Sequence, residues 1–266
     1  MRELEIAQKA ARAGGDVVAR YFRQGVTFRT HDQPYNLVSD ADIEAEAVIA
    51  RTILEAFPDH VILGEETHRG DPQATNLWVV DPLDGTSNFA HRLPQFAVSI
   101  AYYHRGQAVC GVVFNPILGD WFVASRGQGA YFNGQSVRVA AHRDLPDTLM
   151  SAGFSYRRGA VADATVSAIG DLLARQIHGI RRFGSAALEM CYVGAGMLTA
   201  YFEYELSPWD FAAGRLFVEE AGGKVTTCTG SALPLAKTSV LASNGIMHGQ
   251  ILDVLLKHAP PKGGPS

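Results

Sequence analysis

Residues 78–89 read WVVDPLDGTSNF, an apolar run that stops at a proline with Asp81 before it and Asp84 after it. Short apolar runs rich in β-branched residues are typical of buried strands. Gly85 can take backbone angles closed to other residues, and the Gly-Thr-Ser-Asn run that it opens offers N–H groups to an anion at the start of a short helix or turn. The segment therefore predicts two carboxylates, the Leu83 carbonyl and an anion cradle at one strand end, which together suit a hard cation that holds a phosphate.

Acidic residues at other element ends decide whether this pair merely caps a turn. Residues 61–66, VILGEE, form a short apolar strand that ends in Glu65 and Glu66, and residues 207–214, SPWDFAAG, place Asp210 at the start of an Ala-rich helix. Mg²⁺ prefers near-octahedral oxygen ligands and retains positions for water and substrate, so a few carboxylates and one carbonyl fit it. Zinc would call for His or Cys at short spacing, and the sequence has no such pattern.

Several segments of the chain resemble those of the inositol monophosphatase family of Mg²⁺-dependent phosphatases. Three resemble its signatures: GEE at 64–66, WVVDPLDGTSNF at 78–89 and WDFAAG at 209–214. Three more follow the family order: FAVSIA at 96–101, GQGAYFNG at 127–134 and GSAAL at 184–188. The resemblance spans nearly the whole chain. It implies a phosphomonoesterase that hydrolyses myo-inositol 1-phosphate to myo-inositol and phosphate, uses two or three Mg²⁺ ions and is inhibited by Li⁺.

The resemblance also implies a role for individual residues. The metal ligands would be Glu65, Asp81, the carbonyl of Leu83, Asp84 and Asp210. Thr86 would orient a metal-activated water for direct attack on the phosphate. Asp42 would accept the proton of this water, although it could instead be a helix-cap residue. Glu65 would be a catalytic residue as well as a metal ligand. The residues that contact substrate would be Asp84, Gly85, Thr86, Gly184, Ser185, Ala186, Glu203 and Asp210.

The sequence leaves the substrate open. Many relatives carry Lys where this chain has His31, and Glu205 adds an acid beside Glu203. The same chemistry could act on fructose 1,6-bisphosphate, a 3′,5′-nucleoside bisphosphate or histidinol phosphate. A second phosphate would call for further cations, for which the candidates are Arg157, Arg158, Arg181 and Arg182. An additional binding role with RNA or the transcription machinery, as in one bacterial member of the family, is the remaining alternative.

Composition favours a globular protein without nucleic-acid or membrane partners. The 266 residues are 47% hydrophobic with a net charge of −4, so they can bury a sizeable core, and their Arg residues are mostly scattered. Three cysteines without a CxxC pair predict buried free thiols in a reducing compartment. The sequence shows no signal segment and no membrane-length apolar run, so we expect a soluble cytoplasmic protein. Family habit implies a homodimer.

Periodicity predicts two halves of different construction. Helical spacing covers 3–23 and 39–57, and hairpin-spaced strands between 60 and 140 predict a largely antiparallel sheet. After 145, strands and helices alternate, which predicts an α/β layer. We therefore expect an α/β fold with an α+β N-terminal half at 1–144, an α/β half at 145–258 that carries Asp210 and the substrate pocket, and a disordered tail at 259–266. A polar loop is expected over 25–36. The family resemblance implies a layered α-β-α-β-α sandwich of the sugar phosphatase type.

Overall fold

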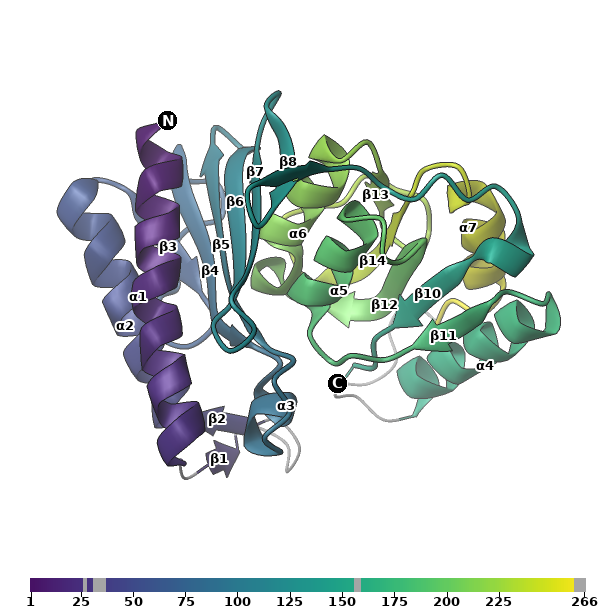
Figure 1. Cartoon of the computed structure of the whole chain (residues 1–266), viewed down its shortest axis with the longest axis horizontal. Coiled ribbons are helices and arrows are strands. Elements are labelled where there is room, and N and C mark those ends of the chain that lie inside the picture. The colour runs from purple at the N-terminus through teal and green to yellow at the C-terminus, as the bar shows by residue number, and fades with distance from the viewer. Residues whose placement is uncertain (26–27, 31–36, 156–158, 261–266) are drawn as a thin grey trace.

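The computed structural model of the chain describes residues 1–25, 28–30, 37–155 and 159–260. Its layers run helix, sheet, helix, sheet, helix across the long axis of the molecule, as Figure 1 shows. Helices α1 (Arg2–Gln24) and α2 (Asp40–Ala56) cover the outer face of the first sheet. The predicted layered α/β sandwich is confirmed.

The first sheet is built from the N-terminal half, and its strands are ordered β3-β4-β5-β6-β7-β8-β9. Only the β3–β4 pair is parallel and every other neighbouring pair is antiparallel, which agrees with the predicted meander. Its elements are β3 (Val61–Gly64), β4 (Asn76–Asp84), α3 (Thr86–Ala90), β5 (Ala97–His104), β6 (Gln107–Asn115), β7 (Asp120–Ser125), β8 (Gly129–Phe132) and β9 (Gln135–Val137).

The second sheet is mixed and has the strand order β11-β10-β12-β14-β13. The β10–β11 and β10–β12 pairs are parallel, whereas β14 pairs antiparallel with both β12 and β13. The elements of this half are η1 (Leu145–Asp147), β10 (Leu149–Ala152), α4 (Ala160–Ala174), β11 (Gly179–Arg181), α5 (Ala186–Gly194), β12 (Ala200–Leu206), α6 (Pro208–Glu220), β13 (Lys224–Thr226), β14 (Thr238–Ser243) and α7 (His248–Lys257).

Residues 77–80 of strand β4 are all apolar because both faces of the strand are buried there. Trp78 and Val80 point into the apolar cluster under α1 and α2, while Leu77 and Val79 point into the cluster between the two sheets. Successive side chains of a strand point to opposite faces, so a strand buried on both sides needs apolar residues at every position. This burial holds the end of β4, where the acids lie, between two packed layers.

Helices α5 and α6 fill the space between the sheets and pack against each other. Small residues permit this approach: a Cβ added at Gly214 would lie 2.8 Å from the Cβ of Met190, and one at Gly194 would lie 2.5 Å from the ring of Phe217. Helix α6 carries Asp210 in its first turn, and the residues that open α5 donate hydrogen bonds to Asp84. Both helices therefore begin beside the acids at the end of β4. The boundary at 144 between the halves stays a prediction.

Two segments differ from the sequence prediction. Strand β4 continues through Pro82 to Asp84, with a shift of register against β5 between Asp81 and Asp84. A proline has no N–H to give to the ladder, and the irregular register removes the need for one. In the polar stretch predicted as a loop, β1 (Phe28–Thr30) and β2 (Leu37–Ser39) pair as a short antiparallel ribbon.

All three cysteines, Cys110, Cys191 and Cys228, are buried and unpaired, as predicted. No helix within the described ranges has both the length and the apolar character needed to span a membrane. Three features of the sequence prediction lie outside the described residues. They are His31, where many relatives carry Lys, the basic pair Arg157 and Arg158, and positions 261–266 of the tail.

Candidate metal and phosphate site

Three element ends bring four acids into one pocket. Asp81 and Asp84 lie at the end of β4, and Asp210 lies in the first turn of α6; one carboxylate oxygen from each falls within 4.8 Å of the others. Glu65 follows β3, whose last residue, Gly64, is paired with Val80 in parallel register, so it lies beside Asp81. Glu65 and the three aspartates line the same pocket, which the Leu83 residue also lines.

One oxygen of each aspartate is held by the protein. This fixes the orientation of the carboxylates and leaves their second oxygens as candidate ligands. The donors are the Leu83 N–H to Asp81 Oδ1 (2.9 Å), the Ser185 Oγ–H and Ala187 N–H to Asp84 Oδ2 (2.5 and 2.8 Å), and the Ser207 N–H to Asp210 Oδ2 (2.7 Å). The Asp84 contacts come from the start of α5, so this one carboxylate joins the two halves of the chain.

The four carboxyl groups crowd one another, and the charge of Lys237 offsets the effect of the other acids on Asp210 only in part. Burial, followed by the neighbouring acids, raises the pKa values of Glu65, Asp81 and Asp210 well above their usual range. Burial also raises the pKa of Asp84 to about 6. Buried like charges destabilise each other unless a counter-charge is present, and an all-oxygen donor set selects a hard divalent cation. The residues present therefore fit Mg²⁺.

The short helix α3 begins directly after the acids. Gly85, which precedes the helix as its N-cap, has φ of 96°, and a Cβ there would lie 2.9 Å from the Gln95 carbonyl oxygen, so the turn requires glycine. Thr86 opens the helix, and its hydroxyl donates to the Leu83 carbonyl at 3.1 Å. The first N–H groups of a helix lack intrahelical partners and face an anion favourably.

Asp42 lies next to the pocket without lining it. Its Oδ2 accepts from the N–H and the hydroxyl of Ser39, which forms the predicted capping box at the start of α2. Its Oδ1 is buried without a hydrogen-bond partner among the residues that the structure describes. Burial raises the pKa of Asp42 to about 7. The hydroxyl of Thr86 is bonded to Leu83, so the relay from Thr86 to Asp42 stays a prediction.

The predicted substrate residues Gly184, Ser185, Ala186 and Glu203 line the same pocket as the acids. Ser185 caps α5, its side chain accepting from the Leu188 N–H at 3.4 Å. Glu203 accepts from the Tyr201 hydroxyl at 2.7 Å, and burial raises the pKa of its carboxyl to about 8.

Several lining residues were missed by sequence reasoning. Glu189 accepts from the N–H groups of Phe183 and Gly184, and burial raises its pKa to about 8. Tyr201 precedes Glu203 by two positions, the spacing that puts strand residues on one face, so this pair was available from the sequence. Ser87 and Asn88 of the predicted anion cradle and Arg182, a predicted candidate cation, also line the pocket, whereas nothing local in the sequence marks Gly153, Phe154 and Leu206.

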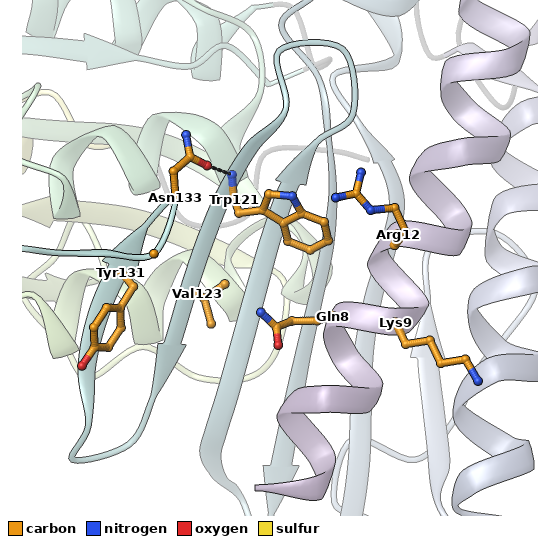
Figure 2. Close-up of a pocket in the computed structure, with 8 residues that line it drawn as sticks. Gln8, Lys9, Arg12, Trp121, Val123, Tyr131 and Asn133 are labelled. Atoms are coloured by element: carbon orange, nitrogen blue, oxygen red, sulfur yellow. Dashed lines mark hydrogen bonds between the residues drawn. The ribbon is translucent and has the colours of Figure 1, made fainter.

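A larger hollow of about 750 Å³ lies on the outer face of the first sheet, between α1 and β7 to β9. Figure 2 shows Arg12 and Lys9 extending from α1 and Trp121 and Tyr131 from the strands. The guanidinium of Arg12 lies 4.6 Å from the centroid of the Trp121 ring. This lining contains no carboxylate, so it offers no metal site, and the acid pocket is the candidate functional site.

A cluster of buried and half-buried aspartates between the sheets of a layered α/β sandwich defines the chain as a protein of the sugar phosphatase class. The inositol monophosphatase family model matches residues 2–260, and the chain belongs to that family. It is 42% identical to the Nus factor SuhB of Salmonella typhimurium over 244 residues, or 91% of each chain.

Two solved structures have the same architecture. The extragenic suppressor protein suhB of Bartonella henselae is 36% identical with a TM-score of 0.90, and the match covers 97% of this chain and 99% of that one. The IMPase of Thermotoga maritima is 34% identical with a TM-score of 0.90, over 97% of this chain and 98% of that one. The similarity thus extends over the whole fold in proteins named for two different roles.

Proposed function

We propose that the chain is a Mg²⁺-dependent phosphomonoesterase of small phosphorylated polyols, with myo-inositol 1-phosphate as its substrate. The observation that carries the proposal is the convergence of Asp81, Asp84 and Asp210 within 4.8 Å, beside Glu65 and the N-terminus of α3. A cluster of acids with raised pKa values, of which Asp81 and Asp84 are buried and Glu65 and Asp210 half-buried, favours cations, and an adjacent helix start favours an anion. Together they suit a metal-bound phosphate.

In this proposal Glu65, Asp81, the Leu83 carbonyl, Asp84 and Asp210 hold two or three Mg²⁺ ions. When bound, Mg²⁺ supplies positive charge to the phosphoryl oxygens and lowers the pKa of water. The N–H groups of Gly85 and Thr86 bind the phosphate, and the Thr86 hydroxyl orients the water for direct attack on phosphorus. Asp42 accepts the proton of this water through its unpartnered oxygen. Because water attacks phosphorus directly, no phosphoenzyme forms.

The polyol would occupy the part of the pocket that Glu203 and the residues before α5 line. Glu203 would accept hydrogen bonds from ring hydroxyls, and the turn formed by Gly184, Ser185 and Ala186 would contact the ring through its backbone. The buried carboxyl groups of Glu189 and Glu203, whose pKa values burial raises to about 8, offer hydrogen bonds to a ring rich in hydroxyls. Arg182 in the same lining is a cation that could contact a second phosphate. Bisphosphates and histidinol phosphate are the alternative substrates for the same chemistry.

A role in transcription is the second candidate, and the names of the relatives favour it more than they favour the inositol substrate. The Salmonella relative is a Nus factor at 42% identity, and the Bartonella structure carries the suhB name as well. Such a role would give the chain RNA or a transcription protein as partner, contrary to the expectation from its charge. It would also agree with a cytoplasmic location, and with a homodimer as the assembly that binds.

Phosphate release tests the first candidate. The purified chain would be assayed with Mg²⁺ on myo-inositol 1-phosphate, fructose 1,6-bisphosphate, a 3′,5′-nucleoside bisphosphate and histidinol phosphate. We expect the highest kcat/KM with myo-inositol 1-phosphate and inhibition by Li⁺. A preference for another compound would replace the substrate and keep the chemistry. Release from none of them would overturn the phosphatase proposal.

Binding tests the second candidate. The wild-type chain and the Asp84→Asn variant would be compared for copurification with RNA polymerase and RNA from the source cells. A transcription role that is independent of hydrolysis predicts equal recovery with both chains. Absence of both partners from the wild-type preparation would count against this role.

A further inference from the structure

The turn at residues 64–68, which carries Glu65 into the acid pocket, is held through its N–H groups by one buried carboxylate. Glu46 lies in the middle of α2 with no exposed surface. Its Oε2 accepts from the Glu66 N–H at 2.8 Å, and its Oε1 accepts from the Thr67 N–H at 2.8 Å and the His68 N–H at 3.0 Å. The Thr67 hydroxyl at 2.5 Å and His68 Nδ1 at 2.9 Å complete five contacts to the carboxylate.

The carbonyl groups of the same turn are held by the side chain of Arg69. Arg69 donates from Nη1 to the carbonyl oxygens of Gly64 and Glu65, at 2.8 and 2.7 Å, and from Nη2 to that of Glu66 at 2.9 Å. A guanidinium presents its donors in a rigid planar fork, so one side chain can fix three successive carbonyls. The N–H groups after Glu65 and the carbonyls around it are thus fixed by two different side chains.

Gly64 shows how closely Glu46 approaches this turn. A Cβ at position 64 would lie 2.4 Å from Oε2 of Glu46, a distance that no side chain could accept without displacing the carboxylate. Glycine before Glu65 therefore serves the approach of Glu46 and not a special backbone angle. The Gly-Glu-Glu segment at 64–66 is thereby linked to a residue on a different element.

We propose that Glu46 and Arg69 are positioning residues, which set the direction of Glu65 in the metal site by fixing the N–H and carbonyl groups of the turn at 64–68. The inference rests on the proposed function. Groups that orient a metal ligand from outside its coordination sphere change metal affinity when they are removed, typically by about 10–100-fold. Neither side chain lines the pocket, so neither touches substrate.

Calorimetric titration with Mg²⁺ alone tests the inference, with Glu46→Gln and Arg69→Lys as variants. Glu46→Gln keeps the shape but turns an amide N–H₂ toward the backbone donors, and Arg69→Lys keeps the charge but loses the fork. The control is Glu44→Gln on the same helix, where the exposed carboxylate pairs with Arg20 at 2.7 Å. We expect a rise of about tenfold or more in the Mg²⁺ dissociation constant for both variants and none for the control.

Kinetics separate positioning from damage to the fold. In both variants the Mg²⁺ concentration for half-maximal phosphate release should rise, while KM for substrate at saturating Mg²⁺ stays unchanged and kcat recovers. Arg69 is exposed, so Arg69→Lys decides the matter if Glu46→Gln does not fold. Wild-type Mg²⁺ affinity in the folded variants would overturn the inference alone. A wild-type chain that binds no Mg²⁺ would overturn the proposed function, and the inference with it.

Discussion

Asp84 links the first sheet to a helix of the C-terminal half of the chain. It belongs to β4 of the first sheet, yet its Oδ2 accepts from Ser185 and Ala187 at the start of α5. Burial raises its pKa to about 6, because a charged carboxylate is costly at a buried position. A bound cation would reduce that cost by balancing the negative charge.

Replacing Asp84 by Asn should abolish Mg²⁺-dependent phosphate release without unfolding the chain. The Asn oxygen can retain the hydrogen bonds from Ser185 and Ala187, whereas the negative charge offered to the metal is lost. Without Mg²⁺ the melting temperature should not fall, because one member of a group of repelling charges has been removed. Phosphate release and circular dichroism melting would be measured on both chains.

The matched control is Asp163→Asn, which changes an exposed aspartate in the first turn of α4. It should leave phosphate release at the wild-type level. Wild-type turnover in Asp84→Asn, at the same Mg²⁺ concentration, would remove Asp84 from the metal ligands.

The raised pKa of Glu189 predicts that the metal-free chain loses stability as pH rises. Its usual pKa lies near 4.5 and burial raises it to about 8 in the fold. The folded chain therefore holds a proton that the unfolded chain has released, and stability falls across this interval by at most about 1.4 kcal/mol per unit of pKa difference. Denaturant unfolding with EDTA at pH 5 and pH 8.5 would measure the loss.

Glu189→Gln should reduce that loss because the side chain no longer titrates. The exposed Glu55→Gln on α2 is the control and should show the wild-type dependence on pH. Equal loss in wild type and Glu189→Gln would show that the carboxyl of Glu189 has the same pKa in both states.

At this scale, the sequence predicted the acids that stand at element ends and missed the groups that hold them. Asp81, Asp84 and Asp210 are recognisable because each follows or precedes a strong local pattern. Glu46 resembles any helical glutamate, and only its tertiary contacts with the turn at 64–68 distinguish it. One signal was available: Glu46 lies four positions after Asp42, which puts both on one helix face.

At the scale of elements, the contact between α5 and α6 depends on glycine. Gly214→Ala should destabilise the chain by about 1–3 kcal/mol, because the added Cβ would lie 2.8 Å from that of Met190. The control is Gly170→Ala in α4, where a Cβ meets nothing within 4 Å and should stabilise the helix by roughly 0.5–1 kcal/mol. Urea denaturation would measure both, and equal effects of the two substitutions would contradict this packing account.

Most elements were predicted because each carries its own period, and the exceptions show where periodicity fails. Pro82 indicated a strand end, but the bulged pairing with β5 tolerates it and β4 continues to Asp84. The ribbon of β1 and β2 was missed because three-residue strands are too short to show a period. Local patterns also do not show which strands pair in the second sheet. Strand β12 pairs with β14, although α6 and β13 lie between them in the sequence.

At the scale of the whole molecule, the acid pocket lies where both sheets and the helices between them meet. Mg²⁺ should therefore stabilise the entire fold. Binding to the native state alone at about 100 times the dissociation constant contributes about 2.7 kcal/mol, equivalent to roughly 5–10 °C in melting temperature. Differential scanning fluorimetry with Mg²⁺ and then excess EDTA should show this rise and its reversal. An unchanged melting temperature would mean that the folded chain gains nothing from the ion.

The central claim is that the aspartates of strand β4 and helix α6 together hold cations against a phosphate. Crystals grown with Mn²⁺ and inorganic phosphate would test it most directly through anomalous scattering at the manganese edge. The account predicts anomalous peaks beside the free oxygens of Asp81, Asp84 and Asp210, with phosphate between them and the start of α3. An acid pocket without such peaks at saturating Mn²⁺ would contradict it.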